Sequence, residues 1–223
     1  MLLRIPAVLN REQLNAVTGL LADARFVDGK LSAGREAKRV KNNQELPLDA
    51  AQTERLNDIV MGGLVNHPVY QWAALPHRVA VPFYARYVPG MAYGNHVDDP
   101  VMGAGARYRA DIAITMFLNA PEHYDGGELA IRTPFGEQTV KLPAGDAILY
   151  PASSTHRVTE VTRGVRLVAV TWVQSLIRDP AKRELLYDLH LAREKLLRMA
   201  PDADETARVS NAYVNLVRMW AEL

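Results

Sequence analysis

The stretch from residue 87 to residue 98 reads Y-V-P-G-M-A-Y-G-N-H-V-D, beginning at Tyr87 and ending at Asp98. Within it, His96 and Asp98 are separated by one residue. On an extended backbone, residues at positions i and i+2 point to the same side of the strand. An imidazole and a carboxylate can therefore reach one metal ion from this stretch without distortion of the chain.

A third ligand must come from elsewhere, and His156 is the strongest choice downstream. Two histidines and one carboxylate on one face of an octahedron leave three positions open, which is the arrangement of non-haem Fe(II) oxygenases. His123 is the alternative, but it stands in a turn-like run, P-E-H-Y-D, that fits a surface residue better. An H-x-D pair alone is a weak signal, since a solvated loop can carry it by chance.

The residues around this H-x-D pair make a metal site a better interpretation, because they follow one another in a specific order. These features are Tyr87, Gly90, His96, Asp98, Gly126-Gly127-Glu128-Leu129, His156-Arg157-Val158, Gly164, Arg166 and Trp172. In this combination the chain resembles the bacterial PKHD-type hydroxylases, relatives of prolyl 4-hydroxylase in the Fe(II)/2-oxoglutarate dioxygenase superfamily. The resemblance extends into both flanking helical regions and so covers most of the chain.

The resemblance implies a reaction and its cofactors. We expect Fe(II) at His96, Asp98 and His156, 2-oxoglutarate as cosubstrate and dioxygen as oxidant. An unactivated C–H bond would be hydroxylated while 2-oxoglutarate yields succinate and carbon dioxide, and L-ascorbate would rescue oxidised iron. Related halogenases lack the carboxylate, so Asp98 favours hydroxylation. The substrate stays open: peptidyl proline or lysine, a free amino acid, or an iron-chelating metabolite.

The far carboxylate of 2-oxoglutarate needs a buried cation, and the planar guanidinium of Arg166 matches a carboxylate with two parallel hydrogen bonds. In a hairpin with the three-residue loop Thr162–Gly164, His156 would pair with Val170 and share its face with Arg166. A two-residue loop would turn Arg166 to the opposite face. The proposed role of Arg166 therefore predicts the longer loop.

Other residues have two interpretations each. The hydroxyl of Tyr87 could donate a hydrogen bond to 2-oxoglutarate, or Tyr87 could be a half-buried residue of a sheet. Thr115 could bind the cosubstrate from a neighbouring strand. We expect Trp172 in the hydrophobic core. Arg107 and Arg109 could contact the substrate or belong to a solvated loop.

Composition excludes several classes of protein. The chain has 223 residues, of which 26 are basic and 25 acidic. These charges nearly cancel, so the composition does not indicate a nucleic-acid partner. It has no cysteine, which excludes disulfides, thiolate catalysis and iron–sulfur clusters. The first residues are too interrupted for a signal peptide, and no apolar run approaches the roughly 18 residues of a membrane span. We therefore expect a cytoplasmic protein without membrane contact.

Periodicity predicts short strands between helical regions. Asn10 and Gln13 form a capping box that should start the first helix, and Asp179-Pro180 should start a later one. Asp202 and Glu205 should form a similar start for the last helix. The predicted helices are 10–24, 49–66, one from 180 to about 200, and one from about 202 to the end; the predicted strands are 79–88, 111–119, 128–132, 138–142, 146–150, 156–161 and 165–173.

This pattern predicts a mainly β protein with flanking helices, of the α+β class. Periodicity does not separate one sandwich or barrel from another, but the resemblance implies a double-stranded β-helix, or jelly roll. We expect a dioxygenase domain with N-terminal helices over residues 1–177 and a C-terminal helical extension over residues 178–223.

The C-terminal helical pair could pack on the core or form a homodimer. The loop 99–109 could act as a lid, and the polar segment 35–44 should be exposed.

Two other functions compete with a hydroxylase. The first is a non-catalytic module that senses iron or 2-oxoglutarate with the same fold. The second is a cupin-like enzyme, although cupins usually use more histidines. The complete set of His96, Asp98, His156 and Arg166 favours the dioxygenase, which would act on a small-molecule or peptide substrate.

Overall fold

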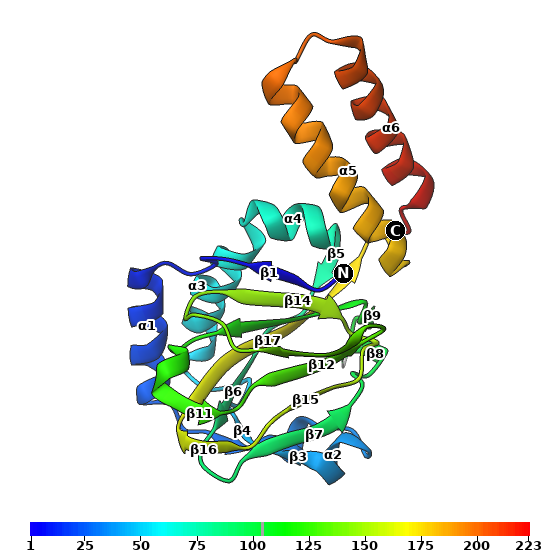
Figure 1. The fold of residues 1–223 in the computed structure, drawn as a ribbon. Helices are drawn as coiled ribbons and strands as arrows, with labels where there is room; N and C mark the ends of the chain where they lie inside the picture. Colours follow the sequence, from blue (N-terminus) through cyan, green and yellow to red (C-terminus); the bar gives the residue numbers. More distant parts are fainter. Residues whose placement is uncertain (104) are drawn as a thin grey trace.

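The computed structural model describes residues 1–103 and 105–223 of the chain. Two antiparallel sheets face each other (Figure 1). The larger sheet has the order β1-β14-β10-β17-β6-β4-β2, with β5 paired to β17. Its strands are β1 (Leu3–Ile5), β14 (Ala147–Pro151), β10 (Ile112–Phe117), β17 (Arg166–Ser175), β6 (Phe83–Tyr87), β4 (Gln44–Glu45), β2 (Val27–Asp28) and β5 (Pro76–Val79).

The smaller sheet has the order β13-β12-β15-β7-β3, and two short ribbons, β11-β16 and β8-β9, complete the β structure that is described. The strands of the smaller sheet are β13 (Gly136–Val140), β12 (Leu129–Thr133), β15 (His156–Val158), β7 (Ala92–His96) and β3 (Lys41–Asn42). The ribbons contain β11 (Tyr124–Gly126), β16 (Val161–Gly164), β8 (Val101–Met102) and β9 (Tyr108–Arg109). The predicted mainly β architecture with flanking helices is confirmed.

One part of the core lies between the two sheets. Ala113 and Phe117 of the larger sheet pack with Leu129, Ile131 and Val158 of the smaller one, and all five are buried. Alternate residues of a strand point to opposite faces, so each sheet buries one row of side chains in this layer. The inner layer is therefore apolar except where the polar groups described below enter it.

Helices cover the outer face of the larger sheet (Figure 1). They are α1 (Arg11–Ala22), α3 (Thr53–Val65) and α4 (Pro68–Ala74). The predicted capping box is confirmed, because the side chain of Asn10 accepts from the backbone N–H of Gln13 and the side chain of Gln13 accepts from that of Asn10. Their apolar faces, with Val17 and Leu56 fully buried, form a second core layer against the sheet.

The segment from residue 29 to residue 45 differs from its prediction. It contains η1 (Gly29–Ser32) and α2 (Ala37–Val40) before β3 and β4. We predicted an exposed polar segment over residues 35–44, yet Lys41 is only 7% exposed and Asn43 only 3%. The prediction failed because β3 joins the edge of the smaller sheet and β4 joins the larger one, so alternate side chains of this segment turn inward.

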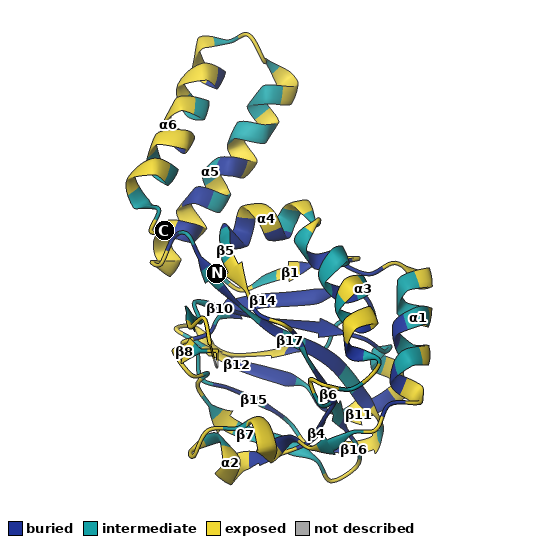
Figure 2. Cartoon of the chain, turned by 180° about the vertical axis from the view of Figure 1, so that it is seen from behind, coloured by how far each residue is buried: buried dark blue, intermediate teal, exposed yellow. Residues whose placement is uncertain are grey.

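The C-terminal helices, α5 (Pro180–Met199) and α6 (Asp204–Trp220), form a hairpin that extends away from the sheets (Figure 1). Much of its surface is exposed (Figure 2). Asp179 caps α5 as predicted, accepting from the backbone N–H groups of Ala181 and Lys182. The predicted cap of α6 is wrong, since its N-cap residue is Ala203 and no side chain caps it. The domain boundary after residue 177 and the homodimer stay predictions.

A small cluster joins this hairpin to the rest of the molecule. It comprises Leu75, Ile177, Leu186 and Tyr213, all buried. His190 of α5 also stacks on Trp72 of α4, with ring centroids 4.1 Å apart. No helix of the described residues combines the length and apolar character needed to cross a bilayer.

The predicted hairpin between residues 156–161 and 165–173 is wrong. β15 pairs with β12 and β7 in the smaller sheet, whereas β17 pairs with β10, β6 and β5 in the larger one. Between them, β16 leaves to pair with β11. Since strand partners far apart in sequence decided this arrangement, local loop length could not reveal it. His156 and Arg166 thus belong to opposite sheets.

Candidate metal centre

Three potential ligands meet at the end of β7. His96 closes that strand, Asp98 follows it, and His156 begins the neighbouring β15 directly opposite His96. Residues that are directly opposite in an antiparallel pair share a face, so the two imidazoles point into the same space. One ligand atom from each of the three residues lies within 4.8 Å of the others.

Each histidine has its Nδ1 atom beside a backbone carbonyl two residues earlier. Nδ1 of His96 lies 2.8 Å from the carbonyl oxygen of Gly94, and Nδ1 of His156 lies 2.9 Å from that of Ser154. A carbonyl only accepts, so these contacts favour a proton on Nδ1 and leave the Nε2 lone pair free for a metal. The local backbone thereby prepares both rings for coordination.

The spacing of the three groups fits a metal ion. The Nε2 atoms of His96 and His156 lie 3.9 Å and 3.8 Å from Oδ1 of Asp98. These distances are too long for hydrogen bonds, but an ion with ligand bonds of about 2 Å can bridge them. Oδ2 of Asp98 is buried and has no hydrogen-bond partner among the described residues.

Electrostatics also favour a cation in this space. Burial, reinforced by the nearby His156, lowers the pKa of His96 to about 4. Burial raises the pKa of Asp98, although His156 opposes that change. Both shifts express the cost of a charged group without solvent. A divalent cation would compensate the carboxylate charge of Asp98 without requiring a proton on His96.

Aromatic rings fix the two imidazoles. Tyr93 stacks on His96 with centroids 3.6 Å apart and an interplanar angle of 10°. Tyr150 meets His156 edge to face at 5.1 Å. Contacts of this kind restrict ring rotation and so hold each Nε2 atom in place. We did not predict either tyrosine from the sequence, because the i+3 spacing of Tyr93 and His96 would place them on opposite faces of a regular strand. The pairing of β7 with β15 is irregular in this stretch.

Arg166 enters the same space from the larger sheet. It opens β17 opposite Tyr87 of β6, and only 1% of its surface is exposed. Its guanidinium carbon lies 5.0 Å from the ring centroid of Tyr87 and 5.7 Å from that of Phe117. No carboxylate of the described chain forms an ion pair with Arg166, and its Nε atom has no partner there. A buried cation in this state is suited to an anionic ligand.

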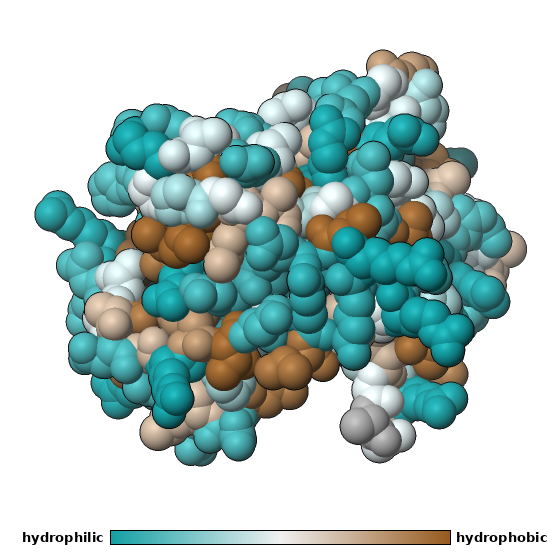
Figure 3. Space-filling model, turned by 90° about the horizontal axis from the view of Figure 1, so that it is seen from below, coloured by the Kyte–Doolittle hydropathy of each residue, from teal (hydrophilic) through white to brown (hydrophobic). Residues whose placement is uncertain are grey.

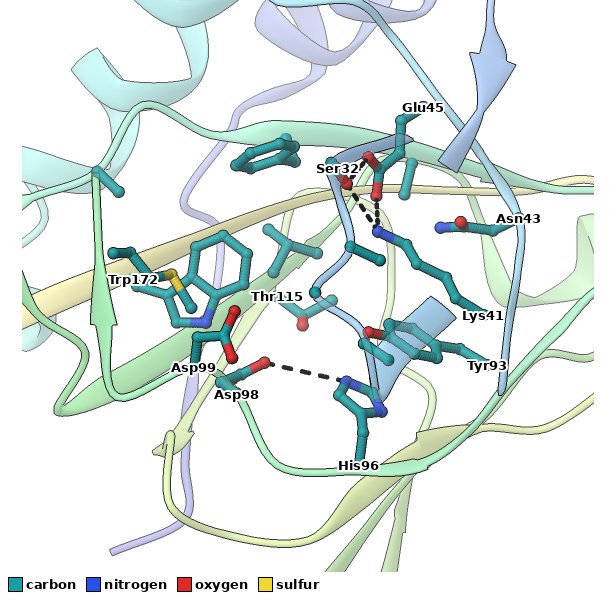
Figure 4. A pocket seen from close by; sticks show the side chains of 18 of the residues that line it. Ser32, Lys41, Asn43, Glu45, Tyr93, His96, Asp98, Asp99, Thr115 and Trp172 are labelled. Carbon is teal, nitrogen blue, oxygen red and sulfur yellow. Dashed lines mark hydrogen bonds and ion pairs between the residues drawn. The ribbon is translucent and has the colours of Figure 1, made fainter. Parts of the chain in front are cut away.

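A cavity of about 590 Å³ connects these groups (Figure 4). This volume is typical of small-molecule sites. Both sheets contribute to its wall, and so does the segment 29–45. All six residues that we predicted for the site line it: Tyr87, His96, Asp98, Thr115, His156 and Arg166.

The cavity wall corrects the prediction for Trp172. We expected a core residue, but Trp172 lines the cavity, and its Nε1 atom is buried without a partner in the described chain. Arg109 is absent from the lining and instead forms ion pairs with Asp111 and Glu222. His123 lies in the short helix η2 (Pro121–His123), away from the three ligands.

Sequence reasoning missed a polar cluster in this wall. Nζ of Lys41 lies 2.5 Å from Oε1 of Glu45, Oγ of Ser32 donates to Oε2 of Glu45 at 2.5 Å, and Lys41 donates to Ser32 at 2.9 Å. Lys41, Asn43 and Glu45 are all buried, while Asn42 between them is exposed. The i, i+2, i+4 spacing in K-N-N-Q-E was the available signal for a shared face.

The predicted lid over residues 99–109 is described only in part. Its two ends pair as the ribbon β8-β9, and residue 104 lies outside the described residues. Val101, Met102 and Tyr108 of this segment line the cavity. The segment thus borders the site, and its movement stays a prediction.

Comparison with known sequences gives consistent matches. The sequence model of the 2OG-Fe(II) oxygenase superfamily matches residues 82–174, and that of the PKHD-type hydroxylase C-terminal domain matches residues 180–222. A PKHD-type hydroxylase from Thioalkalivibrio sulfidiphilus is 52% identical over the full length of both chains. One from a Synechococcus strain is 46% identical, again over the full length of both.

Solved structures show the same fold at much lower identity. A prolyl-4-hydroxylase from Pseudomonas putida is similar with a TM-score of 0.53 and 19% identity, covering 78% of this chain and 92% of that one. A prolyl hydroxylase from Trichoplax adhaerens, solved with a peptide fragment, has a TM-score of 0.56 and 14% identity over 82% and 86% of the two chains. The expected jelly-roll fold is therefore confirmed.

Proposed function

Because this chain belongs to the PKHD-type hydroxylases of the 2OG-Fe(II) oxygenase superfamily, and is therefore a 2-oxoglutarate-dependent dioxygenase, we propose that His96, Asp98 and His156 bind its Fe(II). The observation that carries this assignment is their geometry: three ligand atoms lie within 4.8 Å of one another, and both imidazoles have Nδ1 beside a carbonyl. Iron bound there would supply the activation of dioxygen, with 2-oxoglutarate as reductant.

Arg166 binds the far carboxylate of 2-oxoglutarate. Its planar guanidinium can donate two parallel hydrogen bonds, and its burial excludes competing water. Burial raises the pKa of Tyr87 to about 12, although the Arg166 cation opposes the shift. The Tyr87 hydroxyl therefore keeps its proton at neutral pH and can donate it to the same ligand. Thr115, 3% exposed and on the cavity wall, is a further hydrogen-bonding partner.

The remaining wall positions the substrate and excludes water. Phe83 and Trp172 meet edge to face at 5.7 Å, and Val170 lies in the same wall. Apolar side chains of this kind surround the C–H bond without competing for reaction. The product would be a hydroxylated small molecule or peptide together with succinate and carbon dioxide, and L-ascorbate would serve as the reductant for oxidised iron. Among the compared proteins, proline as the hydroxylated residue is named for the solved structures from Pseudomonas putida and Trichoplax adhaerens.

An anaerobic titration tests the site. Fe(II) and then 2-oxoglutarate are added to the metal-free protein, and the weak visible charge-transfer band of the chelate is recorded. We expect the band in the wild type and in the control His123→Ala, whose histidine lies outside the cavity. The band should vanish in His156→Ala. Absence of the band from the wild type at saturating ligand would overturn the assignment of these three residues as the Fe(II) site.

A further inference from the structure

The charged groups of the cavity are not all used by iron and 2-oxoglutarate. On the proposed function, Asp98 binds the metal and Arg166 binds the cosubstrate. Three other charged side chains line the cavity: Lys41, Glu45 and Asp99. Asp99 stands at the exposed rim, whereas the side chains of Lys41 and Glu45 are only 8% and 10% exposed.

Stability alone does not account for this pair. Lysine and glutamate are almost never so buried unless they are paired. Even a paired buried lysine and glutamate often stabilise a fold no better than apolar residues of similar volume, because both charges lose their water. Because Lys41 and Glu45 line the cavity, a charged ligand there can contact both of them.

The pair retains unused hydrogen-bonding capacity. An ammonium has three N–H donors, and among the described residues Lys41 uses two, toward Glu45 and Ser32. A carboxylate can accept about four hydrogen bonds, and Glu45 accepts one at each oxygen, from Lys41 and Ser32. Lys41 and Glu45 lie side by side in the cavity wall (Figure 4), and among the described residues each keeps hydrogen-bonding capacity for a ligand.

The pair lies close to the metal ligands. Nζ of Lys41 is 5.5 Å from the ring centroid of Tyr93, and that ring stacks on His96 at 3.6 Å. The Tyr93 ring therefore contacts both the ion pair and a metal ligand. A molecule with its head group on Lys41 and Glu45 would occupy the same cavity as the metal ligands.

Much of the remaining cavity wall is apolar. Phe83, Val170, Trp172 and Met102 line it. Exposed aliphatic residues extend this character to the mouth: Leu48, Val81, Val97 and Val101. Seen from below, hydrophobic side chains form separate patches on an otherwise hydrophilic surface (Figure 3). The cavity thus combines a small zwitterionic area with an apolar remainder.

We propose that the primary substrate is a free α-amino acid with an aliphatic side chain, held by its carboxylate on Lys41 and its ammonium on Glu45. This inference rests on the proposed function and names the substrate class for the same site. Ser32 is a positioning residue, since it contacts both members of the pair. The aliphatic side chain then lies along Phe83 and Trp172, with its C–H bonds toward the metal ligands.

The test uses chemical capping of the substrate, which requires no protein variant. Free L-amino acids are compared with their N-acetyl and methyl ester derivatives. Binding to the anaerobic Fe(II) and 2-oxoglutarate complex is measured by calorimetry, and stimulation of succinate formation is measured in air. We expect at least one free aliphatic amino acid to bind and stimulate. Either cap should weaken its binding at least tenfold, because each removes one of the two charges.

Variants then assign each end of the substrate. Lys41→Met should weaken binding of the free amino acid at least tenfold but hardly change binding of its methyl ester. Glu45→Gln should do the same with respect to the N-acetyl derivative. Arg163→Met, which breaks an exposed ion pair with Asp125 outside the cavity, is the matched control and should change neither.

Two outcomes would overturn the proposal. One is equal binding of capped and free forms, or of the same residue within a peptide. The other is a wild-type enzyme that forms the chelate band and decarboxylates 2-oxoglutarate without substrate, yet binds no free amino acid. That second outcome would leave the proposed function intact, whereas a missing band would contradict the function itself.

Discussion

Two buried arginines, one in the β sandwich and one at the base of the C-terminal hairpin, differ in their hydrogen bonding to the rest of the chain. Arg183 of α5 is 4% exposed and donates to the carbonyl oxygens of Ile177 and Arg178. Arg166 of β17 is 1% exposed, and its Nε atom has no partner in the described chain. Arg183, whose guanidinium donates to backbone carbonyls, stabilises the contact between the hairpin and the sheets. Arg166, whose Nε atom lacks a partner, is suited to bind a ligand.

The largest effect is expected at the metal ligands. His156→Ala should reduce turnover to background, beyond the roughly 10–100-fold loss typical of residues that only support a ligand. The thermal unfolding midpoint of the metal-free protein should change little, since the imidazole makes one hydrogen bond, to the Ser154 carbonyl. Activity and unfolding are measured on the same preparation. A large loss of stability would mean that the sandwich needs His156 for folding, contrary to the comparison.

Arg166→Met should weaken 2-oxoglutarate binding about 100-fold, because truncating one partner of a buried charge pair costs about 2–5 kcal/mol. Without ligand, the variant should be at least as stable as the wild type, since an unpaired buried cation is removed. Calorimetry with 2-oxoglutarate and thermal unfolding check the two parts. Destabilisation of the ligand-free variant would show that Arg166 is satisfied within the protein after all.

Arg183→Met is the counterpart in the hairpin. It should lower the free energy of unfolding by about 1–3 kcal/mol, because two backbone carbonyls lose their donor. Affinity for 2-oxoglutarate should not change. Denaturant unfolding and the same calorimetric titration measure both quantities. If Arg183→Met weakens 2-oxoglutarate binding while leaving stability intact, the distinction between the two arginines is wrong.

The smallest effect is expected from His190, at the contact between α5 and α4. Burial lowers its pKa below the ordinary value, although Glu194 opposes the shift. As pH falls below about 6.5, the unfolded chain takes up a proton that the folded hairpin resists, so stability should decrease. His190→Gln should make unfolding less dependent on pH between 7 and 5. An unchanged pH dependence would remove His190 from this role.

Local rules predicted the parts of the molecule that depend on neighbouring residues. The two-residue spacing of His96 and Asp98 predicted that they lie together, although β7 ends at His96. The capping box of Asn10 with Gln13 follows from three-residue spacing. The expected α6 cap failed because the chain turned at Ala203, one residue after Asp202. Small shifts of this kind at helix ends are invisible to pattern alone.

Long-range pairing set the limit of prediction. Arg166 points into the cavity as its proposed role requires, yet it does so from the sheet opposite His156, and not from a shared hairpin. The buried pair of Lys41 and Glu45 depends on β3 and β4 joining different sheets. No local pattern in a polar segment distinguishes that outcome from solvation, because burial was decided by strand partners 40 to 52 residues away along the chain.

The placement of Arg166 and the metal ligands on opposite sheets has a mechanical consequence. A cosubstrate bound to both would act as a cross-link between the sheets, beside the apolar layer that already joins them. The tightness of that link depends on the width of the gap, which is set by core residues such as Phe117 and Ile131. With the proposed ligands bound, catalytic competence would be coupled to the rigidity of the sandwich, and substitutions that touch neither iron nor substrate would change activity.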